Sequence, residues 1–180
     1  VGRLGLEFEF DLSTNGALEA TPLMVDNTLY FTTTFSVLHA VNATTGERVW
    51  TYDPQVPRDF SRRACCGPIS RGAAVYQGNV YLATLDGRLV AINAETGERV
   101  WEVNTVIDPE RNYSITGAPR VARGKVFIGN GGAEFGVRGY VTAYDAATGE
   151  QAWRFFTVPG DPSLPFEHPE MEMAAETWKG

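Results

Sequence analysis

The segment Ala40-Val-Asn-Ala-Thr-Thr-Gly-Glu-Arg-Val-Trp50 decides the fold, because closely similar segments follow it twice along the chain. The second copy is Ala91-Ile-Asn-Ala-Glu-Thr-Gly-Glu-Arg-Val-Trp101, and the third is Ala143-Tyr-Asp-Ala-Ala-Thr-Gly-Glu-Gln-Ala-Trp153. The copies are spaced by about 50 residues, a period found in solenoid and propeller proteins. The chain is therefore built from structural repeats.

Each copy is preceded by a second matching stretch that has the local pattern of β-strands. Short runs of Val, Ile, Tyr and Phe are broken by turn residues, and Asp86-Gly87 is a tight hairpin signal. The Asn/Asp-Ala-x-Thr-Gly stretch predicts a further turn, whose glycine is free to take a positive φ. Each repeat thus reads as four short strands. The preceding stretches are Pro22–Phe31, Gly72–Leu82 and Pro119–Ile128, and the turn glycines are Gly46, Gly97 and Gly149.

Four short strands in about 50 residues are the unit of a β-propeller blade. We predict an all-β fold in which residues 1–180 form part of one propeller, with about three and a half four-stranded blades. The repeats end near Trp50, Trp101 and Trp153, and we expect these indoles to pack on small residues of the neighbouring blade. Ligand binding by the tryptophans and a non-propeller sheet are the alternatives. Because propellers close with roughly four to eight blades, we expect further blades on one or both sides.

Composition and charge narrow the classes of partner. Of the 180 residues, 43% are hydrophobic and 21% are charged, which is typical of a globular protein. The net charge of -7 argues against a nucleic-acid partner. No apolar run reaches the roughly 20 residues that a transmembrane helix needs.

In a repeat protein, chemistry is expected where one copy departs from the others, and the first departure is Cys65-Cys66. Neighbouring Cα atoms lie about 3.8 Å apart, below the usual range for a disulfide. A bond between the two sulfurs would therefore close a strained ring. Two adjacent thiols are also a poor pair of ligands for one metal ion. From the residues alone, the pair is either two reduced thiols or a strained disulfide.

The second departure is the glycine-rich insertion Gly129-Asn-Gly-Gly-Ala-Glu-Phe-Gly136 in the third repeat. Such glycine density lets the backbone approach a flat or charged ligand closely. The carboxylate of Glu134 suits a hard, oxygen-liganded cation such as calcium. A flexible hairpin with a solvated Glu134 is the alternative interpretation.

The third departure lies just before the first strand of each repeat, where the polar residue differs every time. Glu19, Arg71 and Thr116 stand there in the three repeats. In a propeller, this end of the innermost strand faces the central channel. A carboxylate, a guanidinium and a hydroxyl that converge there suit a small, polar, anionic molecule. The alternative is a set of rim residues that bond only to turns.

With these residues, the chain resembles the quinoprotein alcohol dehydrogenases, which are eight-bladed propellers that bind pyrroloquinoline quinone. The resemblance covers nearly the whole chain, and the combination of Cys65-Cys66 with Gly-Gly-Ala-Glu134 is its most specific part. The stretches that carry it are Leu18–Pro22, Ala64–Cys66, Tyr113–Pro119, Gly129–Tyr140 and Phe156–Pro162.

The resemblance implies a role for each of these departures. The cysteine pair is similar to a vicinal disulfide that packs against one face of the quinone ring. Glu134 resembles a ligand of the calcium ion, or of a lanthanide in its place, that polarises a quinone carbonyl. The residues expected to contact the cofactor are Glu19, Cys65, Cys66, Arg71, Thr116, Gly131, Gly132 and Ala133.

The resemblance also implies what the parent protein does. It would oxidise small alcohols to aldehydes or ketones in the periplasm and pass electrons to a cytochrome c or to a haem c domain that follows the propeller. The family's general base is an aspartate on a later blade that no residue here matches, so we expect this chain alone to be inactive. Thr177-Trp178 is not assigned to the family's stacking tryptophan, and His39 and His168 are expected to be structural or surface residues.

Two other functions compete with this interpretation. A non-catalytic propeller of the same repeat family, acting as a scaffold for outer-membrane assembly, would explain the tryptophan repeats. It would not explain Cys65-Cys66 together with Arg71 and Glu134. A sugar dehydrogenase that uses the same cofactor is the third interpretation, but such relatives generally lack the paired cysteines.

Overall fold

Three four-stranded antiparallel sheets make up the chain, one from each sequence repeat. The computed structural model describes residues 2, 5–12, 14 and 16–178. The first sheet contains β1 (Leu23–Val25), β2 (Thr28–Thr32), β3 (Leu38–Asn42) and β4 (Arg48–Tyr52). The second contains β5 (Ala73–Tyr76), β6 (Asn79–Ala83), β7 (Arg88–Asn93) and β8 (Arg99–Asn104). The third contains β9 (Arg120–Ala122), β10 (Lys125–Gly129), β11 (Tyr140–Asp145) and β12 (Gln151–Phe156).

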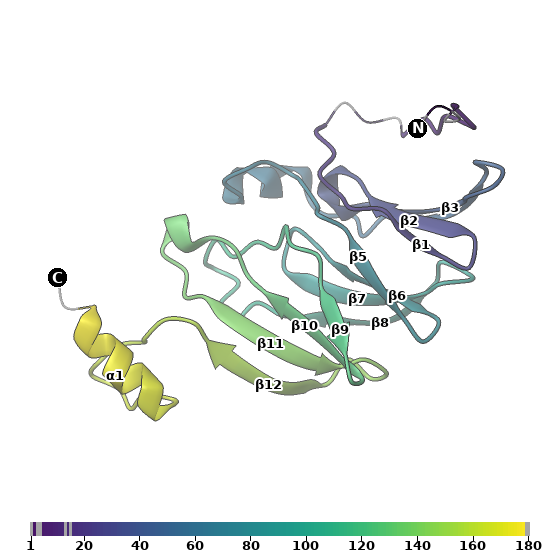
Figure 1. Cartoon of the computed structure of the whole chain (residues 1–180). Helices are drawn as coiled ribbons and strands as arrows, with labels where there is room; N and C mark the ends of the chain where they lie inside the picture. Colours follow the sequence, from purple (N-terminus) through teal and green to yellow (C-terminus); the bar gives the residue numbers. More distant parts are fainter. Residues whose placement is uncertain (1, 3–4, 13, 15, 179–180) are drawn as a thin grey trace.

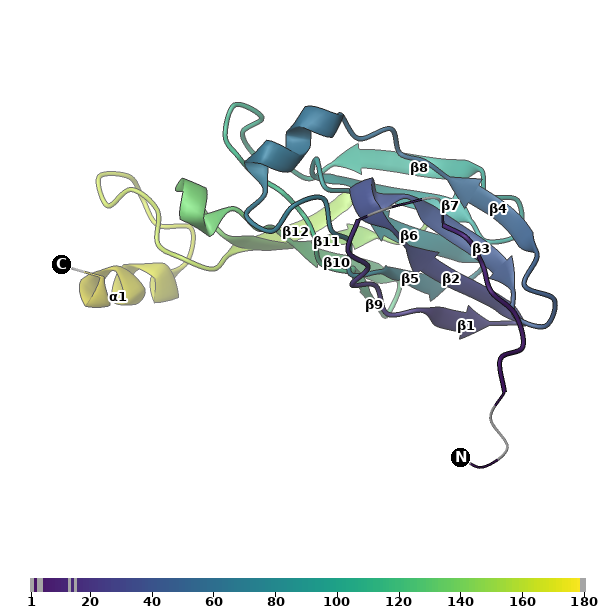
Figure 2. The same cartoon turned by 90° about the horizontal axis from the view of Figure 1, so that it is seen from above.

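Each sheet is a simple meander in which consecutive strands are hydrogen-bonded neighbours. The first strands β1, β5 and β9 contact one another in sequence, so they form the inner edge of the array (Figures 1 and 2). This arrangement confirms the prediction of propeller blades with four strands per repeat. The predicted hairpin at Asp86-Gly87 joins β6 to β7.

Few helical segments interrupt the strands. Three short 3-10 segments, η1 (Thr34–Ser36), η2 (Arg58–Arg63) and η3 (Ala133–Phe135), lie in connections, and the helix α1 (Pro169–Thr177) follows the last sheet. In Figure 1, α1 projects away from the end of β12. No helix among the described residues is long and apolar enough to cross a membrane.

The hydrophobic core lies between the sheets, where each pair of neighbours buries side chains from both. One cluster joins the first sheet to the second and includes Tyr30, Leu38, Val80 and Ile92. A second cluster joins the second sheet to the third and includes Tyr81, Leu89, Val126 and Tyr144. Stability thus comes from face-to-face contact between blades, and each blade needs its neighbour.

The recurrent tryptophans link each blade to the next, as predicted. The indole N–H of Trp50 donates to the carbonyl of Ala94 at 3.0 Å, and that of Trp101 donates to the carbonyl of Ala146 at 3.1 Å. The hydroxyl groups of Tyr30 and Tyr81 donate to the same two carbonyls, at 3.1 and 3.0 Å. Each alanine carbonyl is therefore satisfied by two side chains of the preceding blade.

The two ends of the array differ in how this interface is completed. In the second and third sheets, the turn glycines Gly97 and Gly149 are covered by Trp50 and Trp101 of the preceding blade. In the first sheet, the Phe8 ring covers the equivalent Gly46. At the third sheet, Trp153 is 46% exposed, and its one ring contact among the described residues is a tilted one with Phe127. The third sheet thus presents an uncovered blade face.

Candidate functional site

A cluster of polar side chains forms where the chain enters the three innermost strands. The Arg71 guanidinium lies 3.1 Å from the Glu19 carboxylate, and it donates to the Thr116 hydroxyl at 2.5 Å. The three residues come from three different blades. The predicted convergence of Glu19, Arg71 and Thr116 is therefore present in the structure, while their role toward a ligand stays a prediction.

Backbone hydrogen bonds between neighbouring blades hold this cluster in place. The Arg71 N–H donates to the Thr116 carbonyl at 2.9 Å, and the Thr21 N–H donates to the Arg71 carbonyl at 3.4 Å. Gly72 follows with φ +119°, and a Cβ there would lie 3.3 Å from the Thr21 carbonyl oxygen. A glycine thus lets the strands approach closely just beyond the cluster.

The cluster remains open to a ligand. The side chains of Arg71 and Glu19 are 45% and 43% exposed. An ion pair this exposed contributes little to stability, because water screens it. The Arg71 guanidinium therefore has donors available for a carboxylate or another planar anion, which arginine binds with two parallel hydrogen bonds.

Cys65 and Cys66 follow η2 and are both exposed. The structure has both as free thiols, so the disulfide implied by the family resemblance is not formed in it and stays a prediction. Hydrogen bonds to Cys66 and to Glu134 raise the pKa of the Cys65 thiol to about 12. Cys65 is therefore a protonated thiol at neutral pH in this state.

Glu134 lies on the glycine-rich loop, residues 130–139, which connects β10 to β11. The short segment η3 contains Glu134 and is bounded by Gly132 and Gly136, both with positive φ, at +103° and +71°. Hydrogen bonds from its own backbone N–H and from the Cys65 thiol lower the pKa of the Glu134 carboxyl group. The carboxylate is thus ionised at neutral pH and accepts a hydrogen bond from Cys65.

The cysteine–glutamate contact and the arginine cluster belong to one continuous region. The Gly131 N–H donates to the Ser114 carbonyl at 2.7 Å. Ser114 precedes Thr116 by two residues, so the start of the glycine-rich loop is bonded to the segment that carries Thr116. A Cβ at Gly132 would collide with the carbonyl oxygen of Asn112, so this position requires glycine. All the predicted site residues thus lie on adjoining segments.

A metal ion would find only part of its coordination here. Among the described residues, no group of three or more His, Cys, Asp or Glu side chains is arranged to hold a metal ion. Glu134 supplies one exposed, ionised oxygen ligand, which fits a hard cation such as calcium. The remaining ligands would have to come from the cofactor or from other parts of the protein.

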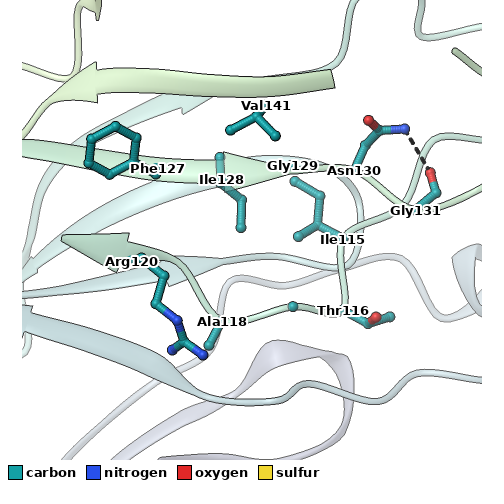
Figure 3. A pocket seen from close by; sticks show the side chains of 11 residues that line it. Ile115, Thr116, Ala118, Arg120, Phe127, Ile128, Gly129, Asn130, Gly131 and Val141 are labelled. Atoms are coloured by element: carbon teal, nitrogen blue, oxygen red, sulfur yellow. Dashed lines mark hydrogen bonds between the residues drawn. The ribbon is translucent and has the colours of Figure 1, made fainter. Parts of the chain in front are cut away.

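A cavity of about 390 Å³ lies beside this region, on the third sheet (Figure 3). It includes Thr116 and Gly131, but none of the other predicted site residues line it. One of its walls is Phe127, whose ring contacts the exposed Trp153, so the cavity belongs to the uncovered face of the third blade. Its lining residues are Ile115, Thr116, Gly117, Ala118, Arg120, Phe127, Ile128, Gly129, Asn130, Gly131 and Val141.

Sequence reasoning missed Asn130, which holds the base of the glycine-rich loop. Its side-chain oxygen accepts the Tyr140 N–H at 2.8 Å, and its amide nitrogen donates to the Gly131 carbonyl at 3.1 Å. The second bond is drawn in Figure 3. The signal was available in the repeats, because Thr33 and Thr84 stand at the same place in the other two blades.

Comparison with known proteins identifies the family. Residues 8–179 match the family model "PQQ: Glucose/ethanol/alcohol dehydrogenase, beta-propeller domain". The chain belongs to this family. It is 58% identical over its whole length to the quinohemoprotein alcohol dehydrogenase ADH-IIG of Pseudomonas putida and spans 25% of that protein. It is also 56% identical to a 1-butanol dehydrogenase (cytochrome c) of Thauera butanivorans, with 97% of this chain and 25% of the relative covered.

Solved structures agree with this membership. The P. putida ADHIIG structure superimposes with a TM-score of 0.95 at 57% identity, covering 98% of this chain and 26% of that one. A europium-containing methanol dehydrogenase gives a TM-score of 0.74 at 35% identity, covering 82% of this chain and 26% of that one. The chain thus spans about a quarter of the length of the relatives it matches.

Proposed function

We propose that this chain forms one wall of the cofactor site of an alcohol dehydrogenase that uses pyrroloquinoline quinone. The observation that carries the proposal is the contact of Cys65 with Glu134 beside the Arg71 cluster. The family match and the names of the similar proteins support a quinone-dependent dehydrogenase over a non-catalytic scaffold.

The polar cluster would hold the acidic groups of the cofactor. Arg71 would bind a carboxylate through its guanidinium, and the contacts to Glu19 and Thr116 keep that guanidinium oriented. Gly131, Gly132 and Ala133 would line the pocket, where the absence of larger side chains leaves room for a flat ring. Bound cofactor would accept two electrons from the alcohol, with the cation acting as a Lewis acid on its carbonyl.

Cys65 and Cys66 would pack against one face of the quinone as a vicinal disulfide. The surroundings of a functional pocket can maintain a strained bond that is unfavourable elsewhere. A disulfide also needs an oxidising compartment, which supports a periplasmic location for the parent protein.

Glu134 would bind the cation through its ionised carboxylate. Calcium is the ion proposed here, because a single flexible carboxylate with further oxygen ligands suits it. A lanthanide is the second candidate, which the similarity to the europium-containing methanol dehydrogenase favours. The relatives' names support a small alcohol as substrate and a cytochrome c or haem c domain as electron acceptor.

The full-length protein, depleted of cofactor, provides the test. We expect Arg71→Met to weaken binding of pyrroloquinoline quinone by about tenfold to a hundredfold, since a charge-assisted hydrogen bond is lost. Cys65→Ser and Glu134→Ala should each lower dye-linked oxidation of a short primary alcohol. Arg99→Met is the matched control, because Arg99 is an exposed arginine on the outer strand β8, paired with Glu102.

Two outcomes would contradict the proposal. If Cys65→Ser and Glu134→Ala both kept cofactor affinity and activity, the site assignment would be wrong. If the unaltered protein bound no quinone at all, the scaffold function would take its place.

A further inference from the structure

The glycine-rich loop carries Glu134, whose carboxylate accepts a hydrogen bond from its own backbone N–H. Contacts inside the short segment η3 do not fix this segment relative to the strands on either side of the loop. The connection between the second and third strands covers residues 33–37 in the first blade and 84–87 in the second, but 130–139 in the third. A longer loop has more conformations to lose when it is ordered. Precise placement of Glu134 therefore requires restraints from outside the segment η3.

One restraint occurs in both the second and the third blade, at the residue that follows the second strand. The strand registers pair Thr32 with Leu38, Ala83 with Leu89 and Gly129 with Val141. The next residue along is Thr33, Thr84 and Asn130, in that order. In the second blade, the Thr84 hydroxyl accepts the Arg88 N–H at 3.0 Å. Asn130 does the same for the Tyr140 N–H at 2.8 Å, so both side chains cap the start of the returning strand.

Asn130 makes two further hydrogen bonds that a threonine at this position could not make. Its amide nitrogen donates to the Gly131 carbonyl at 3.1 Å and to the Arg138 carbonyl at 3.5 Å. These two carbonyls lie at the beginning and near the end of the long loop. A threonine hydroxyl has one proton and a shorter reach, so it cannot hold two separated carbonyls while accepting a backbone N–H.

Two further contacts hold the outer side of the loop. The Gly131 N–H donates to the Ser114 carbonyl at 2.7 Å, and the Arg111 guanidinium donates to the Gly136 carbonyl at 3.0 Å. Arg111 is exposed, and its bond is open to solvent. Asn130 is the residue whose bonds join the two arms of the loop to each other.

We propose that Asn130 is a positioning residue for the cation ligand Glu134: by joining the two arms of the loop, its amide holds the carboxylate where it binds the ion. This inference rests on the proposed function, because it assumes that Glu134 binds a cation. Asn130 itself touches neither ion nor cofactor on this proposal. Its effect reaches the ion through the backbone of residues 131–138.

The test uses the full-length protein with its quinone bound and its cation removed, titrated with calcium alone. We expect Asn130→Thr to raise the Kd for calcium by about tenfold to a hundredfold, the range measured when residues behind a metal ligand are altered. Excess calcium should restore the alcohol oxidation rate of this variant, because its ligand is intact. Glu134→Gln should lose calcium binding, and excess calcium should not restore it.

Thr84→Ala is the matched control. It removes the equivalent cap from the second blade, where the short loop carries no proposed ligand, so it should lower thermal stability while leaving the Kd for calcium unchanged. Threonine at position 130 is the residue that the other two blades use, and Asn130→Ser provides a second variant if Asn130→Thr does not fold.

The outcomes separate the two levels of the proposal. A Kd for Asn130→Thr and Asn130→Ser within about twofold of the unaltered protein, with calcium binding lost in Glu134→Gln, would overturn the positioning role alone. Unchanged calcium binding in Glu134→Gln would overturn the metal site in the proposed function, and the role of Asn130 with it.

Discussion

Trp50 lies over Gly97 so closely that a Cβ on residue 97 would sit 2.8 Å from the indole ring. Gly97 also has φ +75°, a conformation that side chains other than glycine rarely adopt. Two independent requirements therefore meet at one residue: the turn needs a positive φ, and the preceding blade needs the space. Gly149 satisfies both requirements in the same way beneath Trp101.

Comparing alanine substitutions at Gly97 and Gly78 should separate the energetic costs of these two requirements. Gly97→Ala should lower the free energy of unfolding by about 1–2 kcal/mol for the left-handed backbone, and by a further 1–3 kcal/mol or so for the overlap with Trp50. Gly78→Ala is the matched control, since Gly78 has φ +78° but a Cβ added there would have no other atom within 4 Å. Denaturant unfolding of the full-length protein and of the two variants measures both losses of stability. Equal destabilisation by the two substitutions would show that the indole contact contributes nothing.

The sequence repeats made the four-stranded blades predictable, but they did not make every contact between neighbouring blades predictable. The spacing of about 50 residues between Trp50, Trp101 and Trp153 indicated four-stranded units whose indoles pack on the next blade. The structure confirms the four-stranded units, and it confirms the packing for Trp50 and Trp101. The positive φ of Gly97 could also be predicted from its turn. Its contact with Trp50 could not, because that depends on how two blades pack rather than on local sequence.

The site likewise has one part that the repeats predict and one part that they do not. The meeting of Glu19, Arg71 and Thr116 could be predicted, because each lies at the entry to the first strand of its own repeat. The contact between Cys65 and Glu134 could not be derived in this way. Cys65 lies in the connection between β4 and β5, and Glu134 lies in the insertion between β10 and β11. The two segments are not equivalent in the repeats, so alignment of the blades says nothing about their separation.

The high pKa of Cys65 predicts an unreactive thiol in the reduced protein. With a pKa of about 12, Cys65 has very little thiolate at pH 8. Alkylation by iodoacetamide should therefore be at least about tenfold slower than for an ordinary exposed thiol, because the thiolate is the nucleophile. Glu134→Gln should speed the alkylation, since it removes the carboxylate that accepts a hydrogen bond from the thiol and, through its negative charge, also disfavours the thiolate. Mass spectrometry of the Cys65 peptide over time would check this, and equal rates in both proteins would contradict it.

Buried His39 predicts a loss of stability in mild acid. The residue is 6% exposed, and its ring stacks on Phe31 and contacts the Thr33 and Thr51 hydroxyls. Burial, with a smaller effect of the Arg48 charge, lowers the pKa of His39 below its ordinary 6.5. The unfolded chain therefore binds a proton more readily than the folded one, and stability should fall as the pH drops below 6.5.

His39→Gln isolates this effect, because glutamine keeps hydrogen-bonding capacity without titrating. The apparent Tm of the full-length protein should fall between about pH 7.5 and pH 5.5 by more than that of the variant. Measurements at one scan rate make the two proteins comparable. Identical pH dependence would show that His39 does not carry this proton linkage.

The Arg138–Glu167 pair predicts an acid-sensitive attachment of the segment after β12. Arg138 contacts both carboxylate oxygens of Glu167, at 2.5 and 2.9 Å, donates to the Val158 carbonyl and lies over the Phe156 ring. Its hydrogen bonds are the main cause that lowers the pKa of Glu167 to about 2. A carboxyl group with a depressed pKa contributes stability that is present above its ordinary pKa of 4.5 and is lost as the pH falls toward 2.

Comparison with Glu167→Gln should reveal this contribution. Limited proteolysis within residues 157–178 should be faster in the variant at neutral pH, and the difference should shrink as the pH is lowered from about 4.5 to about 2. Arg138→Lys should resemble Glu167→Gln at neutral pH, because lysine cannot form the two parallel bonds or the same stacking contact. The pair is 22% and 37% exposed, so solvent screening limits the effect to local opening rather than global unfolding. A difference in cleavage rate that stayed constant down to pH 2 would show that the ion pair does not hold this segment.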